Sequence, residues 1–185
     1  MLITKVLLKL LIPVRWASSV YFNFHYLPFK QAVKLPIHLR KPHFLMLKGK
    51  IIIDCPAKQI KRGMIQLGAD CDIARLDAGI RIRIEGGSII FKGKCRIGTD
   101  SCLHIGEKGN LIFANNFVNS TKVIIDCYHR IEFKENVRVG PGTLIMDTDF
   151  HAMQKVAANS GGDAPKRKAM AQSQSVKTAG LPPAA

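Results

Sequence analysis

The sequence is poor in acidic residues, has a single tryptophan, and contains no pair of cysteines in the C-x-x-C spacing. Its five cysteines are odd in number, so we expect neither a thiolate zinc site nor a complete disulfide framework, and reduced thiols in a cytoplasmic setting. No apolar run reaches the roughly 20 uninterrupted residues that a membrane-spanning helix needs. These absences disfavour a disulfide-rich secreted scaffold and an integral membrane protein.

The shortage of acidic residues is uneven along the 185-residue chain. The 28 basic residues against 13 acidic ones give a net charge of +15. Residues 1–53 hold nine basic and no acidic residues (+9), residues 54–151 hold 14 and 12 (+2), and residues 152–185 hold five and one (+4). A nucleic-acid interface should place its basic residues within the folded part. We therefore predict no nucleic-acid partner, although the basic ends can contact other anions.

The first 16 residues, MLITKVLLKLLIPVRW, form an apolar stretch that Lys5 and Lys9 interrupt. The lysine at position 9 and the lack of a clear cleavage site argue against a signal peptide. The spacing favours a short amphipathic helix over Met1–Trp16. Such a helix can lie on the inner face of a membrane, or it can cap a β domain or pack between subunits. The sequence leaves both interpretations open.

The next segment, residues 21–43, is rich in aromatic residues, prolines and basic residues. The prolines argue against a regular helix here. Interleaved aromatic and basic side chains can stack on single-stranded nucleic acid, but an irregular apolar cover over the core is the favoured interpretation. Residues 1–53 are thus predicted to form a basic cap with a helical and an irregular part.

A repeat occupies the centre of the chain, where Phe91–Phe150 divides into three blocks of twenty residues. Apolar residues coincide when the blocks are stacked. The expected columns are Phe91, Leu111 and Ile131; Ile97, Phe117 and Val137; and Ile105, Ile125 and Ile145. Aliphatic residues also recur every six positions, with Gly, Asn or Asp between them. A period of six inside a period of twenty predicts a triangular solenoid of parallel strands, with small residues at its corners.

The domain organisation follows from this repeat. We predict an all-β fold with a solenoid over residues 54–151 and a disordered low-complexity tail over residues 152–185, which has no aromatic residue. Alternating apolar residues would also suit an antiparallel sandwich. The hexads and the scarcity of Asn-Gly or Asp-Gly turns favour the solenoid.

Two motifs carry a family resemblance. Residues 115–126 read NNFVNSTKVIID, and residues 137–151 read VRVGPGTLIMDTDFH. This combination resembles the hexapeptide-repeat acyltransferases, in particular the galactoside/maltose O-acetyltransferase branch and enzymes of surface polysaccharide biosynthesis. The resemblance implies a left-handed parallel β-helix and a homotrimer. It also implies acetyl transfer from acetyl-CoA to a sugar hydroxyl, without a metal.

The same resemblance assigns roles to individual residues. The family's catalytic histidine falls on His151, and a neutral imidazole is suited to take the proton of an attacking hydroxyl. The carboxylate that binds the acceptor falls on Asp126. The acceptor-site asparagine falls on Asn119, with Asn116 as an alternative. Asp147 or Asp149 would orient His151.

Other interpretations of these residues remain open. Asp147, Asp149 and His151 alternate along one strand and could instead ligate a divalent metal. Asp126 could be a corner residue and His151 an inert loop residue. The remaining histidines of the repeat, His104 and His129, are interpreted as ordinary surface residues. The whole chain could also be a non-catalytic solenoid that associates with a membrane or a polysaccharide-synthesis partner through its basic ends.

The resemblance ends at His151, whereas members of the family continue with further coils that contribute to the CoA groove. The composition of residues 152–185 therefore suggests a truncated or frameshifted coding sequence. On this expectation, His151 would lack the neighbouring coil that positions it, and loss of the C-terminal coils could leave this chain inactive.

Overall fold

The computed structural model describes residues 16–70 and 78–148. His151, Asp149, the stretch before Trp16 and the tail of residues 152–185 lie outside the described residues. Residues 16–26 form a helix, called here the N-terminal helix. The other elements are α2 (Phe29–Ala32), β1 (Ile37–Leu39), β2 (Pro42–Leu47), β3 (Lys50–Ile53), β4 (Ile65–Ala69), β5 (Ile80–Ile84), β6 (Ser88–Phe91), β7 (Cys95–Gly98), β8 (Ser101–Ile105), β9 (Asn110–Phe113), β10 (Phe117–Asn119), β11 (Ile124–Cys127), β12 (Arg130–Phe133), β13 (Arg138–Val139) and β14 (Leu144–Met146).

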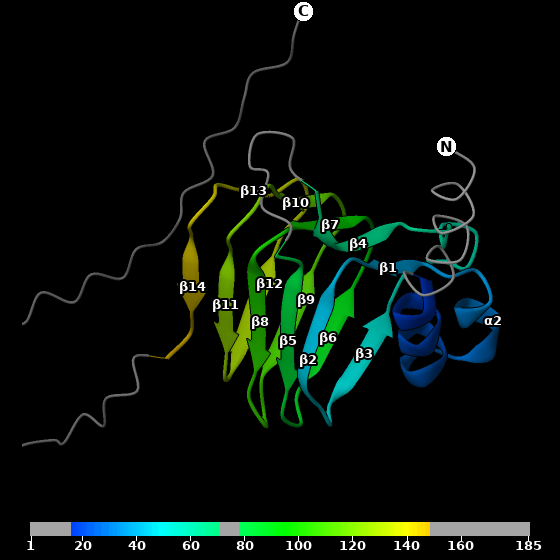
Figure 1. The fold of residues 1–185 in the computed structure, drawn as a ribbon, viewed down its shortest axis with the longest axis horizontal. Coiled ribbons are helices and arrows are strands. Elements are labelled where there is room, and N and C mark those ends of the chain that lie inside the picture. Colours follow the sequence, from blue (N-terminus) through cyan, green and yellow to red (C-terminus); the bar gives the residue numbers. More distant parts are fainter. Residues whose placement is uncertain (1–15, 71–77, 149–185) are drawn as a thin grey trace, which may run out of the picture. The chain divides into compact units, whose positions relative to one another are not determined.

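The strands form three stacked sheets in which each strand pairs with the strand three places along the chain (Figure 1). Sheet A has the order β1-β4-β7-β10-β13, sheet B has β14-β11-β8-β5-β2, and sheet C has β12-β9-β6-β3. The chain therefore visits the three sheets in turn. Every pairing between these strands is parallel. The prediction of a mostly β chain with stacked parallel strands is confirmed, and the antiparallel alternative is wrong for the described residues.

Alternation along the strands explains why these segments form sheets with one buried face. In β5, with the sequence IRIRI, the three isoleucines are buried and the two arginines are exposed. Successive side chains of a strand point to opposite faces of a sheet, so one set fills the interior. The buried side chains of all three sheets join in one hydrophobic cluster. Four described cysteines, at positions 55, 95, 102 and 127, are free.

The predicted twenty-residue columns are correct for only part of the repeat. Ile125 lies beside Ile145, as expected, but on its other side it lies beside Leu103 and not Ile105. Phe91 likewise lies beside Phe113, which is 22 residues away, instead of Leu111. The reason is the turn between β8 and β9, which has four residues, whereas the turn between β11 and β12 has two.

The stack of strands begins at Ile37 in β1, upstream of the predicted start at Asp54. The N-terminal helix covers this end. The Asn23 side chain accepts a hydrogen bond from the Ile37 amide at 3.1 Å and donates one to the Ile37 carbonyl at 2.7 Å, and Ser19 Oγ accepts one from the Leu39 amide at 2.9 Å. The helix thus satisfies backbone groups of an edge strand that would otherwise be unpaired.

The helical segments cover one end of the stack, whereas residues 37–53 of the predicted cap form β1, β2 and β3 of the stack itself. The expectation that residues 21–43 form no regular helix is wrong. The N-terminal helix continues through residue 26, and Pro28 stands just outside α2 as its N-cap. A proline is well tolerated at the start of a helix because its missing amide would have no partner there. Among the described residues, no helix has the length and apolar character needed to cross a membrane.

Candidate functional site

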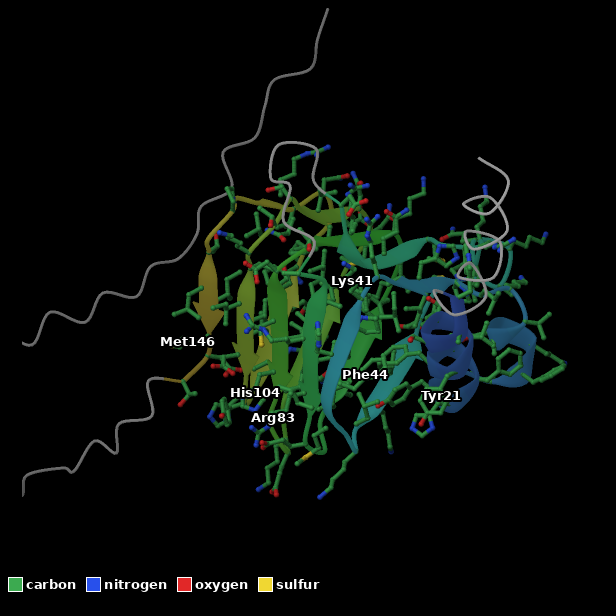
Figure 2. All side chains as sticks on the ribbon, viewed as in Figure 1. Tyr21, Lys41, Phe44, Arg83, His104 and Met146 are labelled. Atoms are coloured by element: carbon green, nitrogen blue, oxygen red, sulfur yellow. The ribbon has the colours of Figure 1, made fainter. Side chains whose placement is uncertain are left out.

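A row of outward-facing side chains crosses sheet B and contains one of the predicted site residues. The parallel register places Arg83 of β5 beside His104 of β8, and His104 beside Asp126 of β11 (Figure 2). Met46 and Met146 occupy the two ends of the row. Because the strands are parallel and in register, residues 20 to 22 positions apart become direct neighbours from Arg83 to Met146, and Met46 lies beside Arg83 across a longer interval of 37 positions.

The imidazole of His104 lies between two carboxylates. Its Nδ1 atom is 2.5 Å from Asp126 Oδ1, and its Nε2 atom is 3.4 Å from Glu85 Oε1. Glu85 also pairs with Arg83, whose Nη2 atom lies 2.7 Å from the same oxygen. The side chains of His104, Glu85 and Asp126 are 18%, 23% and 21% exposed, so the cluster is partly open to solvent.

An aromatic ring closes one side of this cluster. Tyr128 packs edge-on against His104, with ring centroids 5.3 Å apart. The space for the tyrosine comes from Gly106, where a Cβ atom would lie 2.8 Å from the Tyr128 ring. Any larger residue at this position would displace the ring from the imidazole.

The charges of the cluster affect its titrating groups. Partial burial raises the pKa of Glu85, but hydrogen bonds from His104 and Arg83 outweigh this effect and leave the pKa below its usual value. Burial and the nearby carboxylates of Asp126 and Glu85 raise the pKa of Tyr128. Glu85 is therefore an anion at neutral pH, and Tyr128 is a neutral phenol. The cluster offers anionic acceptors and an imidazole, which are groups suited to binding hydroxyls and accepting protons.

Asn119, the predicted acceptor-site asparagine, lies in the interior of the stack. It is fully buried. Its Nδ2 atom donates to three main-chain carbonyls, those of Thr121 at 3.2 Å, Val139 at 3.3 Å and Gly140 at 3.3 Å. The structure therefore does not bring Asn119 together with Asp126 on the outer face. The alternative residue, Asn116, stands at a corner with a φ of 66° and donates to Asn136 Oδ1 at 2.8 Å.

Asp147 occupies a bend after β14, where its side chain accepts hydrogen bonds from main-chain amides of the residues that follow β11. Its carboxylate accepts hydrogen bonds from the amides of Tyr128 at 2.7 Å and His129 at 2.8 Å. The Cys127 thiol lies 3.6 Å from one of the same oxygens. Burial raises the pKa of Asp147, but the hydrogen bonds outweigh that effect and lower it. Both oxygens thus already have partners within the stack.

This arrangement predicts a pH-dependent stabilisation by Asp147. We expect Asp147→Asn to lower the free energy of unfolding at pH 7 by about 1–2 kcal/mol, because a charged acceptor of amide hydrogen bonds is replaced by a weaker neutral one. The folded-state pKa lies below the unfolded value of about 3.9, so the stabilisation is complete above about pH 4 and is lost as the pH falls toward the folded-state pKa. Urea unfolding at pH 7 and at pH 3 measures both effects.

The control for this prediction is Asp54→Asn, since Asp54 is exposed and lies outside the Asp147 hydrogen-bond network. It should change the unfolding free energy by less than about 0.5 kcal/mol at either pH. An Asp147→Asn effect of equal size at pH 7 and pH 3 would contradict the proposed role of the charge.

His104 is the central residue of this cluster, and the sequence pattern did not point to it. Its position within a coil favours an ordinary surface histidine, and the twenty-residue columns do not align it with Asp126. The two residues are 22 positions apart and become neighbours only through the longer β8–β9 turn. A search for polar residues at offsets of 20 to 22 on the outward face would have found the pair.

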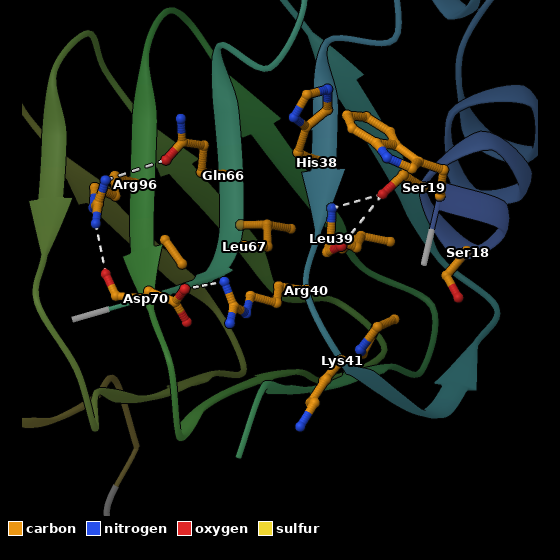
Figure 3. Close-up of a pocket in the computed structure, with 13 residues that line it drawn as sticks. Ser18, Ser19, His38, Leu39, Arg40, Lys41, Gln66, Leu67, Asp70 and Arg96 are labelled. Carbon is orange, nitrogen blue, oxygen red and sulfur yellow. Dashed lines mark hydrogen bonds and ion pairs between the residues drawn. The ribbon is translucent and has the colours of Figure 1, made fainter. Parts of the chain in front are cut away.

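The larger of two cavities described here lies beside β1, β4 and β7 of sheet A and has a volume of about 670 Å³ (Figure 3). Its charged walls come from Arg40, Lys41, Asp70 and Arg96. Arg40 forms an ion pair with Asp70, and Arg96 Nη2 donates to the main-chain oxygen of Asp70 at 2.6 Å. Neither Asp126 nor His104 lines this cavity, so it is separate from the cluster on sheet B.

Over residues 16–70 and 78–148, no group of three or more His, Cys, Asp or Glu side chains is arranged to hold a metal ion. The metal alternative of the sequence analysis involved Asp149 and His151, which lie outside these ranges.

No protein-family model matches the chain, and neither a curated protein nor a solved structure is significantly similar to it.

Proposed function

We propose that this protein is an acetyl-CoA-dependent O-acetyltransferase that acts on a sugar hydroxyl in surface polysaccharide biosynthesis. The observation that carries the proposal is the Asp126 carboxylate, which is partly exposed on the outer face of a parallel stack and hydrogen-bonded to His104. The family resemblance of residues 115–151 assigned Asp126 to the acceptor site from the sequence alone. Its position on an accessible face, beside an imidazole, is compatible with that assignment.

The proposed chemistry uses a hydroxyl acceptor and a thioester donor. Acetyl-CoA supplies the activated acyl group. His151 accepts the proton of the sugar hydroxyl as the oxygen attacks the thioester carbonyl, and the same proton then neutralises the departing thiolate. Asp126 accepts a hydrogen bond from a sugar hydroxyl and orients it, while His104 fixes the carboxylate from the neighbouring coil. The cavity beside sheet A is lined by other residues, so the proposal concerns the acceptor side and assigns no residues to the donor.

The proposal includes the finer features that the resemblance implies. These are a left-handed coil, a homotrimer with the site at subunit interfaces, and a cytoplasmic location with peripheral contact at the inner face of the membrane. The stacked parallel sheets support the coil. Asp147 serves the turn after β11 in this scheme, and Asp149 remains the proposed orienting residue for His151.

An acyl-transfer assay tests the proposal. Full-length protein is incubated with acetyl-CoA and galactose, maltose or N-acetylglucosamine, and the release of free thiol and the acetylated sugar are both measured. We expect His151→Ala to reduce the rate by about 100- to 10,000-fold, the contribution of a general base. Asp126→Asn should chiefly raise the KM for the sugar. His129→Ala is the matched control, because His129 is exposed and outside the proposed site.

Two results would overturn the assignment. One is an active protein whose rate is unchanged by His151→Ala. The other is a protein that keeps its fold, as judged by circular dichroism, and transfers no acetyl group to any of the three sugars at millimolar concentrations.

A further inference from the structure

The helical end of the molecule carries a group of exposed apolar side chains. The N-terminal helix buries Phe22 and Asn23 against the strands, while its other face is open. We call this open face and its continuation on α2 the aromatic patch. It comprises Val20 (39% exposed), Tyr21 (56%), Phe24 (47%), Phe29 (73%) and Val33 (56%).

The patch is continuous across the two helical segments. Phe24 and Phe29 pack edge-on, with ring centroids 6.0 Å apart. Tyr21 stacks on His25 at 5.4 Å, and Figure 2 shows Tyr21 at the end of the molecule where the helices lie. Single exposed apolar residues are common on proteins, whereas a contiguous group with three aromatic rings indicates an interaction surface.

The segment of the chain that carries the patch is basic. Residues 16–53 contain six Lys and Arg and no Asp or Glu. Lys30 is exposed directly beside Phe29. Lys48 and Lys50 line a cavity of about 620 Å³ together with Tyr26 and other residues of the helical segments. Within the described part of the chain, none of these three lysines forms an ion pair.

Tyr26, which lines this cavity, is notable for its hydroxyl group. The hydroxyl of Tyr26 is buried and has no hydrogen-bond partner among the described residues. Burial raises the pKa of this phenol to about 12, so it remains a donor at neutral pH.

From these observations we infer that the aromatic patch and the adjacent lysines dock this protein onto the surface of an anionic phospholipid bilayer. Aromatic rings are favoured at the boundary between headgroups and acyl chains, where Phe24 and Phe29 would enter. Lysines at the same level are attracted to lipid phosphates. The basic charge of residues 16–53 favours this occupant over a second copy of the chain, whose equally basic segment would repel the first.

Vesicle sedimentation with the full-length protein tests the docking surface. Vesicles of phosphatidylcholine alone are compared with vesicles that also contain phosphatidylglycerol, at low and high salt. We expect binding to the anionic vesicles that weakens as salt screens the lysines. The assay needs no acyl transfer, so its failure is distinguishable from failure of the proposed activity.

Variants separate the two parts of the surface. Phe24→Ser and Phe29→Ser should each weaken partitioning by about tenfold or more, the effect of losing a buried aromatic side chain. Lys48→Gln and Lys50→Gln should each weaken binding to anionic vesicles by about fivefold. Leu144→Ser is the matched control, because Leu144 is 55% exposed on β14, at the opposite end of the stack (Figure 1). It should bind like the unchanged protein.

Three outcomes would overturn this proposal. The first is the absence of binding to anionic vesicles at low salt. The second is unchanged binding by the Phe24→Ser/Phe29→Ser double variant, which would assign docking to another part of the chain. The third is a patch covered by a second copy, seen as an oligomer in sedimentation equilibrium that the same double variant dissociates without any vesicle binding by the parent protein.

Discussion

Replacing Phe113 with alanine is expected to lower the free energy of unfolding by about 3–5 kcal/mol, the usual loss for a fully buried phenylalanine. Phe113 stacks between Phe91, at a centroid distance of 5.4 Å, and Phe133, at 5.3 Å. It also packs edge-on against Phe117 at 4.7 Å. The substitution would open a cavity between the three remaining rings, and stacked coils leave the neighbouring backbone little freedom to close it.

Guanidinium unfolding at a fixed protein concentration measures this loss. The matched control is Phe29→Ala, which makes the same change at a side chain that is 73% exposed and should alter stability by less than about 0.5 kcal/mol. Phe113→Leu should fall between the two, because it retains part of the buried volume. Equal effects of Phe113→Ala and Phe29→Ala would contradict the ring stack.

The same stack shows how far the sequence predicted the fold. The recurrence of aliphatic residues every six positions predicted the parallel strands of the central repeat, because each short strand and its corner carry the signal locally. The register between coils depends on turn lengths, and the turn after β8 is two residues longer than the turn after β11. The columns were therefore correct from Ile125 to Ile145 but shifted by two residues between Phe91 and Phe113.

The helix at the start of the described chain was missed for a different reason. Its aromatic residues and the nearby Pro28 argued for irregular structure on local grounds. The helix is instead stabilised by tertiary contacts, because the side chains of Ser19 and Asn23 form hydrogen bonds with the backbone of β1. A contact with a strand 14 to 20 residues away leaves no local signal that a sequence pattern could reveal.

The candidate site shows the same difference between features with a local sequence signal and features that depend on the tertiary structure. Asp126 could be chosen from a motif, and the structure brings it to an exposed face. Its partner His104 was not chosen, because the pairing depends on the register of two coils, which the twenty-residue columns misplaced by two residues. The same alternation that directs Asp126 outward directs its neighbour Ile125 inward. A motif thus identifies candidate residues. The face of the sheet on which each side chain lies is set by the alternation along its strand.

A substitution of Asn119 can distinguish by experiment between the role implied by the family resemblance and the role indicated by the structure. The resemblance made it an acceptor-binding residue, whereas the structure buries it completely and surrounds it with carbonyls. We expect Asn119→Ala to lower the free energy of unfolding by about 2–5 kcal/mol, because the carbonyls of Thr121, Val139 and Gly140 would lose a buried donor. Thermal and guanidinium unfolding at one protein concentration give this value.

Asn115→Ala provides the control, since Asn115 is exposed and its side chain accepts a single hydrogen bond, from the Lys94 amide at 3.1 Å. That variant should lose no more than about 1.5 kcal/mol. A stable Asn119→Ala protein with a raised KM for the sugar acceptor would instead support the role implied by the resemblance. A destabilised protein whose remaining folded fraction keeps its KM would identify Asn119 as an internal support of the coil, because a residue without access to the acceptor can affect binding only through the fold.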